Sequence, residues 1–157
     1  MATRRTIKIK NWSDVFEEYV ANAAIIPGML IELMSTGKVR AHATPSGSAL
    51  PMFPLEDEFL GKSINDAYAA NDVIPQVWIP GPGDQVFALL DDGENATVGA
   101  FLESAGNGFL QVYSSAASNN ADAVDHRIVG VALEAVNLTS SSDTWPTADR
   151  RILIRII

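Results

Sequence analysis

The chain has 157 residues, no cysteine and a formal net charge of −8 at pH 7. This length suits one domain with a sizeable hydrophobic core, and the lack of cysteine excludes a disulfide framework and a thiolate metal site. No apolar run approaches the roughly 20 residues that span a bilayer, and no apolar stretch follows the basic N-terminus as in a signal peptide. We therefore expect a soluble protein that is made in the cytoplasm.

The charge is unevenly distributed along the chain. Residues 1–10 hold four basic residues and no acid, so the other 147 residues hold 7 basic and 19 acidic groups, a charge of −12. A body with this charge repels nucleic-acid phosphates at long range. The basic segment could contact nucleic acid or an acidic protein surface, or it could be a solvated, frayed terminus, and charge alone leaves these alternatives open.

The first predicted element is a strand over residues 6–10. Ile7 and Ile9 alternate with Lys8 and Lys10, which is the period of a strand with one apolar and one basic face. A strand that carries lysines suits the edge of a sheet, or an arm that adds to a neighbour's sheet.

A short helix is predicted next, over residues 13–21. Ser13 can cap it, acidic residues fall in its early turns where the helix dipole favours them, and its apolar side chains share one stripe. About nine residues are marginal for an isolated helix, so the stripe must rest on the body or on a partner. We divide the chain into a basic N-terminal arm with this helix, residues 1–24, and a β body, residues 25–157.

Short strands separated by turns follow from residue 25 onward. Pro27-Gly28 opens a first hairpin, in which the turn Thr36-Gly37 joins the two strands, and Asn107-Gly108 between two apolar segments is a strong hairpin signal. A further helix is predicted around Ser63–Ala70. Short strands with frequent turns favour an all-β fold, as a barrel or a sandwich. The predicted strands of the body are 29–33, 38–43, 77–79, 86–90, 101–103, 109–113, 128–135 and 151–157.

The last of these strands has a regular pattern. Ile152, Ile154 and Ile156 alternate with Arg151 and Arg155, so we predict the isoleucines inward and the arginines outward. A small polar stretch, residues 114–125, is predicted to be a surface loop.

Catalytic and metal-binding patterns are sparse. His42 and His126 are the only histidines, and neither has a second His or Cys at ligand spacing. The acidic clusters at 56–58 and 91–94 lack the alternating ligands of a calcium loop, and we interpret them as solvated turns. There is no nucleophile elbow, phosphate loop or dinucleotide-binding glycine motif. We therefore predict no catalytic residue, no metal site and no cofactor.

Several short motifs occur in a fixed order between residues 25 and 157. In that order they resemble the family of small decoration, or cement, proteins on the heads of tailed bacteriophages. One departure is Asn71-Asp72, where the family pattern has Gly-Asp, although Asn tolerates the same left-handed turn. The matching segments are Pro27-Gly28, Glu56 to Gly61, Ile64 to Tyr68 (I-x-D-x-Y), Pro82 to Val86 (PGD-x-V), Gly99 to Gly108 (G-x-x-L-x-S-x-G-x-G) and Val129 to Glu134 (VG-x-A-L-E).

The resemblance implies a compact β-tulip or small β-barrel and a structural role without chemistry. It implies a virion protein on the outer capsid surface that binds the major capsid protein, commonly as a homotrimer. Such a protein stabilises the shell by cross-linking neighbouring capsomers, without direct contact to nucleic acid or membrane. The basic segment lies outside the matched pattern and could lie along a neighbouring capsid subunit. The predicted capsid-binding residues are Arg4, Arg5, Ile7, Lys8, Ile9, Lys10 and Trp12.

Two other classes of function remain open. One is a carbohydrate- or host-surface-binding β module displayed on a virion, which would need a coplanar row of exposed aromatic rings. Trp12, Trp78 and Trp145 are dispersed along the sequence, but folding could gather them. The other is a small hydrolase on a β-barrel, which would need two carboxylates, or a histidine and a carboxylate, converging in one pocket.

Overall fold

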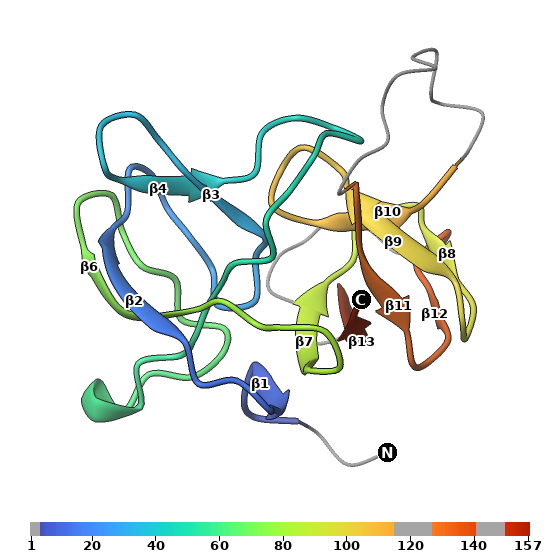
Figure 1. Cartoon of the computed structure of the whole chain (residues 1–157), viewed down its shortest axis with the longest axis horizontal. Helices are drawn as coiled ribbons and strands as arrows, with labels where there is room; N and C mark the ends of the chain where they lie inside the picture. Colours follow the sequence, from blue (N-terminus) through green and yellow to red (C-terminus); the bar gives the residue numbers. More distant parts are fainter. Residues whose placement is uncertain (1–3, 115–126, 141–149) are drawn as a thin grey trace.

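The computed structural model describes residues 4–114, 127–140 and 150–157, and the structural statements below concern these residues. They form an all-β domain, as predicted, arranged in several antiparallel sheets without a closed barrel (Figure 1). No helix among them is long and apolar enough to cross a membrane. The strands are β1 (Lys8–Lys10), β2 (Phe16–Val20), β3 (Ile31–Leu33), β4 (Val39–Ala41), β5 (Phe53–Pro54), β6 (Val73–Trp78), β7 (Gln85–Leu89), β8 (Asn95–Ala96), β9 (Phe101–Ser104), β10 (Leu110–Val112), β11 (Ile128–Ala132), β12 (Val136–Asn137) and β13 (Arg151–Ile156), with one 3-10 turn, η1 (Glu58–Leu60).

The largest sheet has six strands in the order β1-β7-β13-β11-β9-β10, and every neighbouring pair is antiparallel. Its inner face carries alternate residues such as Val86, Ile154 and Leu102, which are fully buried in the first of two hydrophobic clusters. The sheet curls until Leu110 forms a single bridge with Leu90. The curled sheet therefore encloses most of its own core.

A second group of strands lies at the other end of the long axis. The sheet β2-β6-β5 and the hairpin β3–β4 pack around the second cluster, which contains Ile25, Ile31 and Ile74. Figure 1 shows these strands at one end, β8 to β12 at the other end, and β7 with β13 between them. Leu89 of β7 belongs to the second cluster while its neighbours Ala88 and Leu90 belong to the first, so β7 joins the two halves.

Both predicted hairpins are confirmed. β3 pairs with β4, and β9 pairs with β10. In the second turn Gly108 has φ +84°, and a Cβ there would come within 3.0 Å of Ala41. The departure from the family pattern is also accommodated as expected, because Asn71 adopts φ +70° in the left-handed region.

Both predicted helices are wrong. Residues 16–20 form β2, which pairs with β6, so Phe16 lies opposite Trp78. A nine-residue stripe is too short to hold a helix without support, and the free edge of β6 satisfies its backbone groups instead. Residues 63–70 form turns around Tyr68, which makes an isolated bridge to Ile25.

Arg151 and Arg155 both lie on the outward face of β13, as predicted, but only Arg155 is exposed. Arg151 is 3% exposed, and its guanidinium donates to the carbonyls of Pro27 and Ile64. It also lies 5.8 Å from the centre of the Phe87 ring. Burial lowers the pKa of Arg151 to about 10, opposed by the negative charge of Glu56. The outward face of β13 is covered at this end by the segments before β3 and before β6.

Candidate functional site

The predicted N-terminal arm is an edge strand of the domain's own sheet. Ile7 is fully buried in the first hydrophobic cluster, and Ile9 packs against it. The backbone N–H of Ile7 donates to the Glu56 carboxylate at 3.1 Å, and its carbonyl accepts from the N–H of Phe87 at 2.9 Å. The sequence allowed this lysine-bearing strand to be either a sheet edge or an arm that adds to a neighbour's sheet. In the structure it is a sheet edge.

This arrangement corrects the prediction for one acidic cluster. Glu56 and Asp57 are buried instead of solvated, at 6% and 8% exposure. Glu56 binds the backbone of β1, and the Asp57 carboxylate accepts from the N–H of Leu60 in η1. In the other acidic cluster, residues 91–94, Asp91 pairs with Arg150 at 3.3 Å.

Arg4 lies over the outer face of the sheet. Its guanidinium binds both oxygens of Glu134, at 2.9 and 3.0 Å, and stacks 5.1 Å from the centre of the Phe87 ring. Glu134 also accepts from the N–H of Leu153 at 2.8 Å. Arg4 thus covers the sheet and has little freedom to reach a partner.

The remaining predicted residues gather at one corner of the domain. Trp12 is 78% exposed, and the ammonium of Lys10 lies 5.7 Å from the centre of its ring. Lys8 packs 4.8 Å above the Phe16 ring and pairs with Asp14 at 3.2 Å. We call Lys8, Lys10 and Trp12 the Trp12 corner; Arg5, which is also exposed, precedes them.

A buried carboxylate holds this corner in place. Asp84 is fully buried in the turn before β7 and accepts from the backbone N–H groups of Trp12 and Gly81. Its own carbonyl accepts from the N–H of Ile156 at 2.9 Å. A large aromatic ring that is exposed on a fixed turn, beside cations, is typical of a protein contact site.

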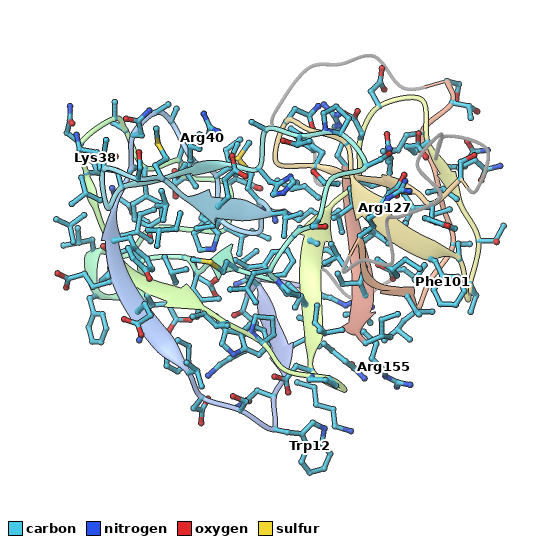
Figure 2. The ribbon with its side chains drawn as sticks, turned by 45° about the horizontal axis from the view of Figure 1, so that its top comes forward. Trp12, Lys38, Arg40, Phe101, Arg127 and Arg155 are labelled. Atoms are coloured by element: carbon cyan, nitrogen blue, oxygen red, sulfur yellow. The ribbon has the colours of Figure 1, made fainter. Side chains whose placement is uncertain are left out.

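A second exposed group lies on the same face and was not singled out from the sequence. Lys10, Gln85 and Arg155 are opposite one another across β1, β7 and β13, and Arg155 is in turn opposite Val131. Val131 is paired with Phe101, which is 47% exposed. Figure 2 shows Phe101 and Arg155 near each other at one side of the domain. We call Phe101, Val131 and Arg155 the Phe101 strip. The strand register brings these residues together, and this register is not evident from the sequence.

His42 has a structural environment. It is 2% exposed, and its Nδ1 lies 2.7 Å from the hydroxyl of Ser104, which is itself fully buried. Its Nε2 lies 3.1 Å from the carbonyl of Ser48 and 3.7 Å from Glu32. Because the hydroxyl is sealed from solvent, this group ties β4 to β9 and presents no nucleophile to a substrate. His126, Trp145 and the predicted loop 114–125, except Ser114, lie outside the described residues.

An open hollow lies near the β9–β10 turn, and its ionisable groups are Asp91, Asp92 and Arg150. Asp91 pairs with Arg150 and also accepts from the side chain of Asn107 at 3.1 Å. Both contacts engage Oδ1 of Asp91, so this carboxylate links Arg150 to the β9–β10 turn. No group of three His, Cys, Asp or Glu side chains within the described ranges is placed to hold a metal ion.

Comparison with known proteins gives a likeness in structure only. No protein-family model and no curated protein matches the sequence. A solved structure, described as the N base of the head fiber gp8.5 of bacteriophage phi29, superposes with a TM-score of 0.54 at 12% identity. The match covers 91% of this chain and 93% of that chain. At this identity the likeness shows a shared fold over nearly the whole domain.

Proposed function

We propose that this protein is a structural component of a bacteriophage virion, bound to the outer surface of the capsid. The observation that carries the proposal is the match of almost the whole chain to the N base of a head fiber. The order of short motifs along residues 25–157, which resembles capsid decoration proteins, supports it independently of the superposition.

In this proposal the Trp12 corner contacts the major capsid protein. Aromatic and basic side chains are enriched among the residues that dominate protein contacts, and Trp12 offers a large rigid surface beside Lys8 and Lys10. Ile7 and Ile9 position the corner through the core, and Arg4 is engaged with Glu134, so these three residues act by placing β1.

The stabilising action follows from bridging. We propose that a homotrimer grips neighbouring capsomers at several sites at once. After the first site is occupied, the others bind at an effective concentration of roughly millimolar, which raises avidity by about 10²–10⁴. A protein that binds the assembled lattice better than dispersed subunits stabilises the lattice by linkage. No bond-breaking step is involved.

The geometry gives less support to carbohydrate binding. Among the described residues, Trp12 and Phe101 are the exposed aromatic side chains of the Trp12 corner and the Phe101 strip, but four strand spacings separate β1 from β9. At about 4.8 Å per spacing, the path along the curled sheet between the two strands is roughly 19 Å, and Figure 2 shows Trp12 and Phe101 at separate corners, so they do not form one stacking platform. Binding of the isolated domain to a glycan array would favour this alternative.

The test is co-sedimentation with intact phage heads over a series of salt concentrations. The wild-type protein should bind, and salt should weaken binding because exposed cations contribute. Trp12→Ala should reduce affinity by about 30-fold, the size expected for a contact hot spot. Lys10→Ala should also weaken binding, and Lys38→Ala is its matched control, since Lys38 lies far from Trp12 (Figure 2). Wild-type protein that fails to bind heads, or Trp12→Ala with unchanged affinity, would contradict the proposal.

A further inference from the structure

The turn η1 carries the most exposed large apolar side chain in the described part of the chain. Phe59 is 89% exposed and its neighbour Leu60 is 71% exposed. Figure 1 shows this turn projecting at one end of the long axis of the molecule. We call Glu58, Phe59 and Leu60 the Phe59 turn. Two adjacent large apolar side chains held outward are unusual on a monomeric surface and indicate a contact site.

The Phe59 turn is held in shape by its own hydrogen bonds and by anchors on both sides. The carboxylate of Asp57 accepts from the N–H of Leu60, and the N–H of Gly61 donates to the carbonyl of Glu58. Before the turn, Asp57 is buried; after it, Ile64 is buried in the core and its carbonyl accepts from Arg151. A partner would therefore meet a preorganised surface, which reduces the ordering cost of binding.

A complementary surface lies away from this end of the molecule, on strands β9, β11 and β13. The Phe101 strip offers two apolar side chains, Phe101 and Val131, beside the exposed Arg155. The Phe59 turn offers two apolar side chains beside the exposed Glu58. Neither Arg155 nor Glu58 forms a side-chain hydrogen bond or ion pair with the described residues. The two surfaces thus match in apolar content and are opposite in charge.

We infer that the Phe59 turn of one copy docks on the Phe101 strip of a second copy of this chain. Phe59 and Leu60 would cover Val131 and Phe101, and Glu58 would pair with Arg155. One molecule cannot satisfy both surfaces itself, because η1 lies at one end of the long axis, whereas β9, β11 and β13 lie in the middle and toward the other end (Figure 1). The contact is head-to-tail, and such contacts close into rings when the rotation between copies permits.

The inference rests on the proposed function for its place in the virion, since the ring would be the trimer that bridges capsomers. It gives that trimer a defined interface and leaves the Trp12 corner free for the capsid. Shielding two apolar pairs from water and joining two otherwise unpaired charges both favour association.

Engineered cysteines can test the contact, because the chain contains no cysteine of its own. Equal amounts of Leu60→Cys and Val131→Cys proteins are mixed under mild oxidation, and the mixed disulfide dimer is measured over time. The matched control replaces Val131→Cys with Leu33→Cys, at a residue that is 53% exposed and lies outside the strip. Docking should make the first pair couple about 10²-fold faster than the control. Equal rates would overturn the inference.

Charge reversal gives a second, independent readout. Glu58→Arg and Arg155→Glu should each weaken self-association, measured by sedimentation equilibrium, by roughly tenfold, and the two changes together should restore it. Both sites are exposed, so circular dichroism should report a native fold for each variant. Failure of the double variant to recover would contradict the pairing. Neither experiment uses capsids, so its failure would leave capsid binding standing, just as failure to bind heads would leave a trapped contact standing.

Discussion

The backbone N–H of Ile7 donates to the buried carboxylate of Glu56, 49 positions further along the chain. This bond ties the N-terminal strand to the segment that leads into η1, and Ile7 itself is fully buried. The strand that carries the basic residues is therefore part of the folded core, and its removal has a cost for the whole domain.

Ile7→Ala should lower the free energy of unfolding by about 3 kcal/mol, because it leaves a cavity in a packed core. Ile9→Ala should cost less, about 1 kcal/mol, since Ile9 is only half-buried. Urea denaturation followed by tryptophan fluorescence measures both. Deleting residues 1–20 should unfold the domain, because it removes β1 and β2 together. A truncated protein with an unchanged denaturation midpoint would show that both strands are dispensable for folding.

The Asp84 carboxylate is predicted to position Trp12. Asp84→Ala would leave the N–H groups of Trp12 and Gly81 without their acceptor, at a cost of about 3 kcal/mol for two charge-assisted bonds. Trp12→Ala removes an exposed ring and should change stability by less than about 0.5 kcal/mol. Thermal unfolding separates the two effects. Equal destabilisation by both substitutions would mean that the ring, and not the carboxylate, holds this turn.

The strands of the body could be predicted because their residues alternate and their turns carry Gly, Pro or Asn. β3, β4, β6, β7, β9, β10, β11 and β13 all lie within or overlap predicted strands, although the prediction covers only the end of β6. β2 could not be predicted in this way, since its apolar positions suit a helical stripe as well as a strand, and the choice depends on the edge of β6. The two-residue strands β5, β8 and β12 are too short to show any period.

The candidate contact surfaces were predicted only in part. The basic and aromatic residues at the start of the chain indicated one surface, but nothing in their spacing shows that Ile7 enters the core or that Glu134 engages Arg4. The Phe101 strip draws on three strands that are far apart in sequence, and Arg151 is buried by segments that the period of β13 does not reveal. Such features depend on tertiary pairing, which a local pattern does not encode.

Gly28 and Gly37 offer a matched pair of substitutions. Both have positive φ, +87° and +80°, but a Cβ at Gly28 would lie 2.6 Å from Arg151 Nη1 and 2.9 Å from the Phe87 carbonyl, whereas Gly37 has nothing within 4 Å. Gly37→Ala should therefore cost only the backbone strain, about 1 kcal/mol. Gly28→Ala should cost at least about 3 kcal/mol, since overpacking is added. The denaturant midpoints of the two variants measure these costs. Equal costs would show that the side chain of Arg151 and the backbone near Phe87 move aside without a large loss of stability.

Tyr68 makes the stability of the domain depend on pH in alkaline solution. Its hydroxyl donates to the carbonyl of Leu55 at 2.7 Å, and the side chain is 2% exposed. Burial, and then the charges of Asp57 and Glu56, raise the pKa of Tyr68 well above its ordinary value of 10.0. The folded protein thus keeps the phenolic proton above pH 10, where the unfolded chain loses it.

Because the folded state then binds more protons than the unfolded state, the contribution of Tyr68 is complete below pH 10 and falls as the pH rises further, by up to about 1.4 kcal/mol per pH unit. The absorbance of tyrosinate, compared between the wild type and Tyr68→Phe, should show that Tyr68 ionises only together with loss of near-ultraviolet circular dichroism. In the Tyr68→Phe protein this part of the alkaline destabilisation should be absent. Ionisation of Tyr68 near pH 10 in a protein that is still folded would contradict the assigned burial.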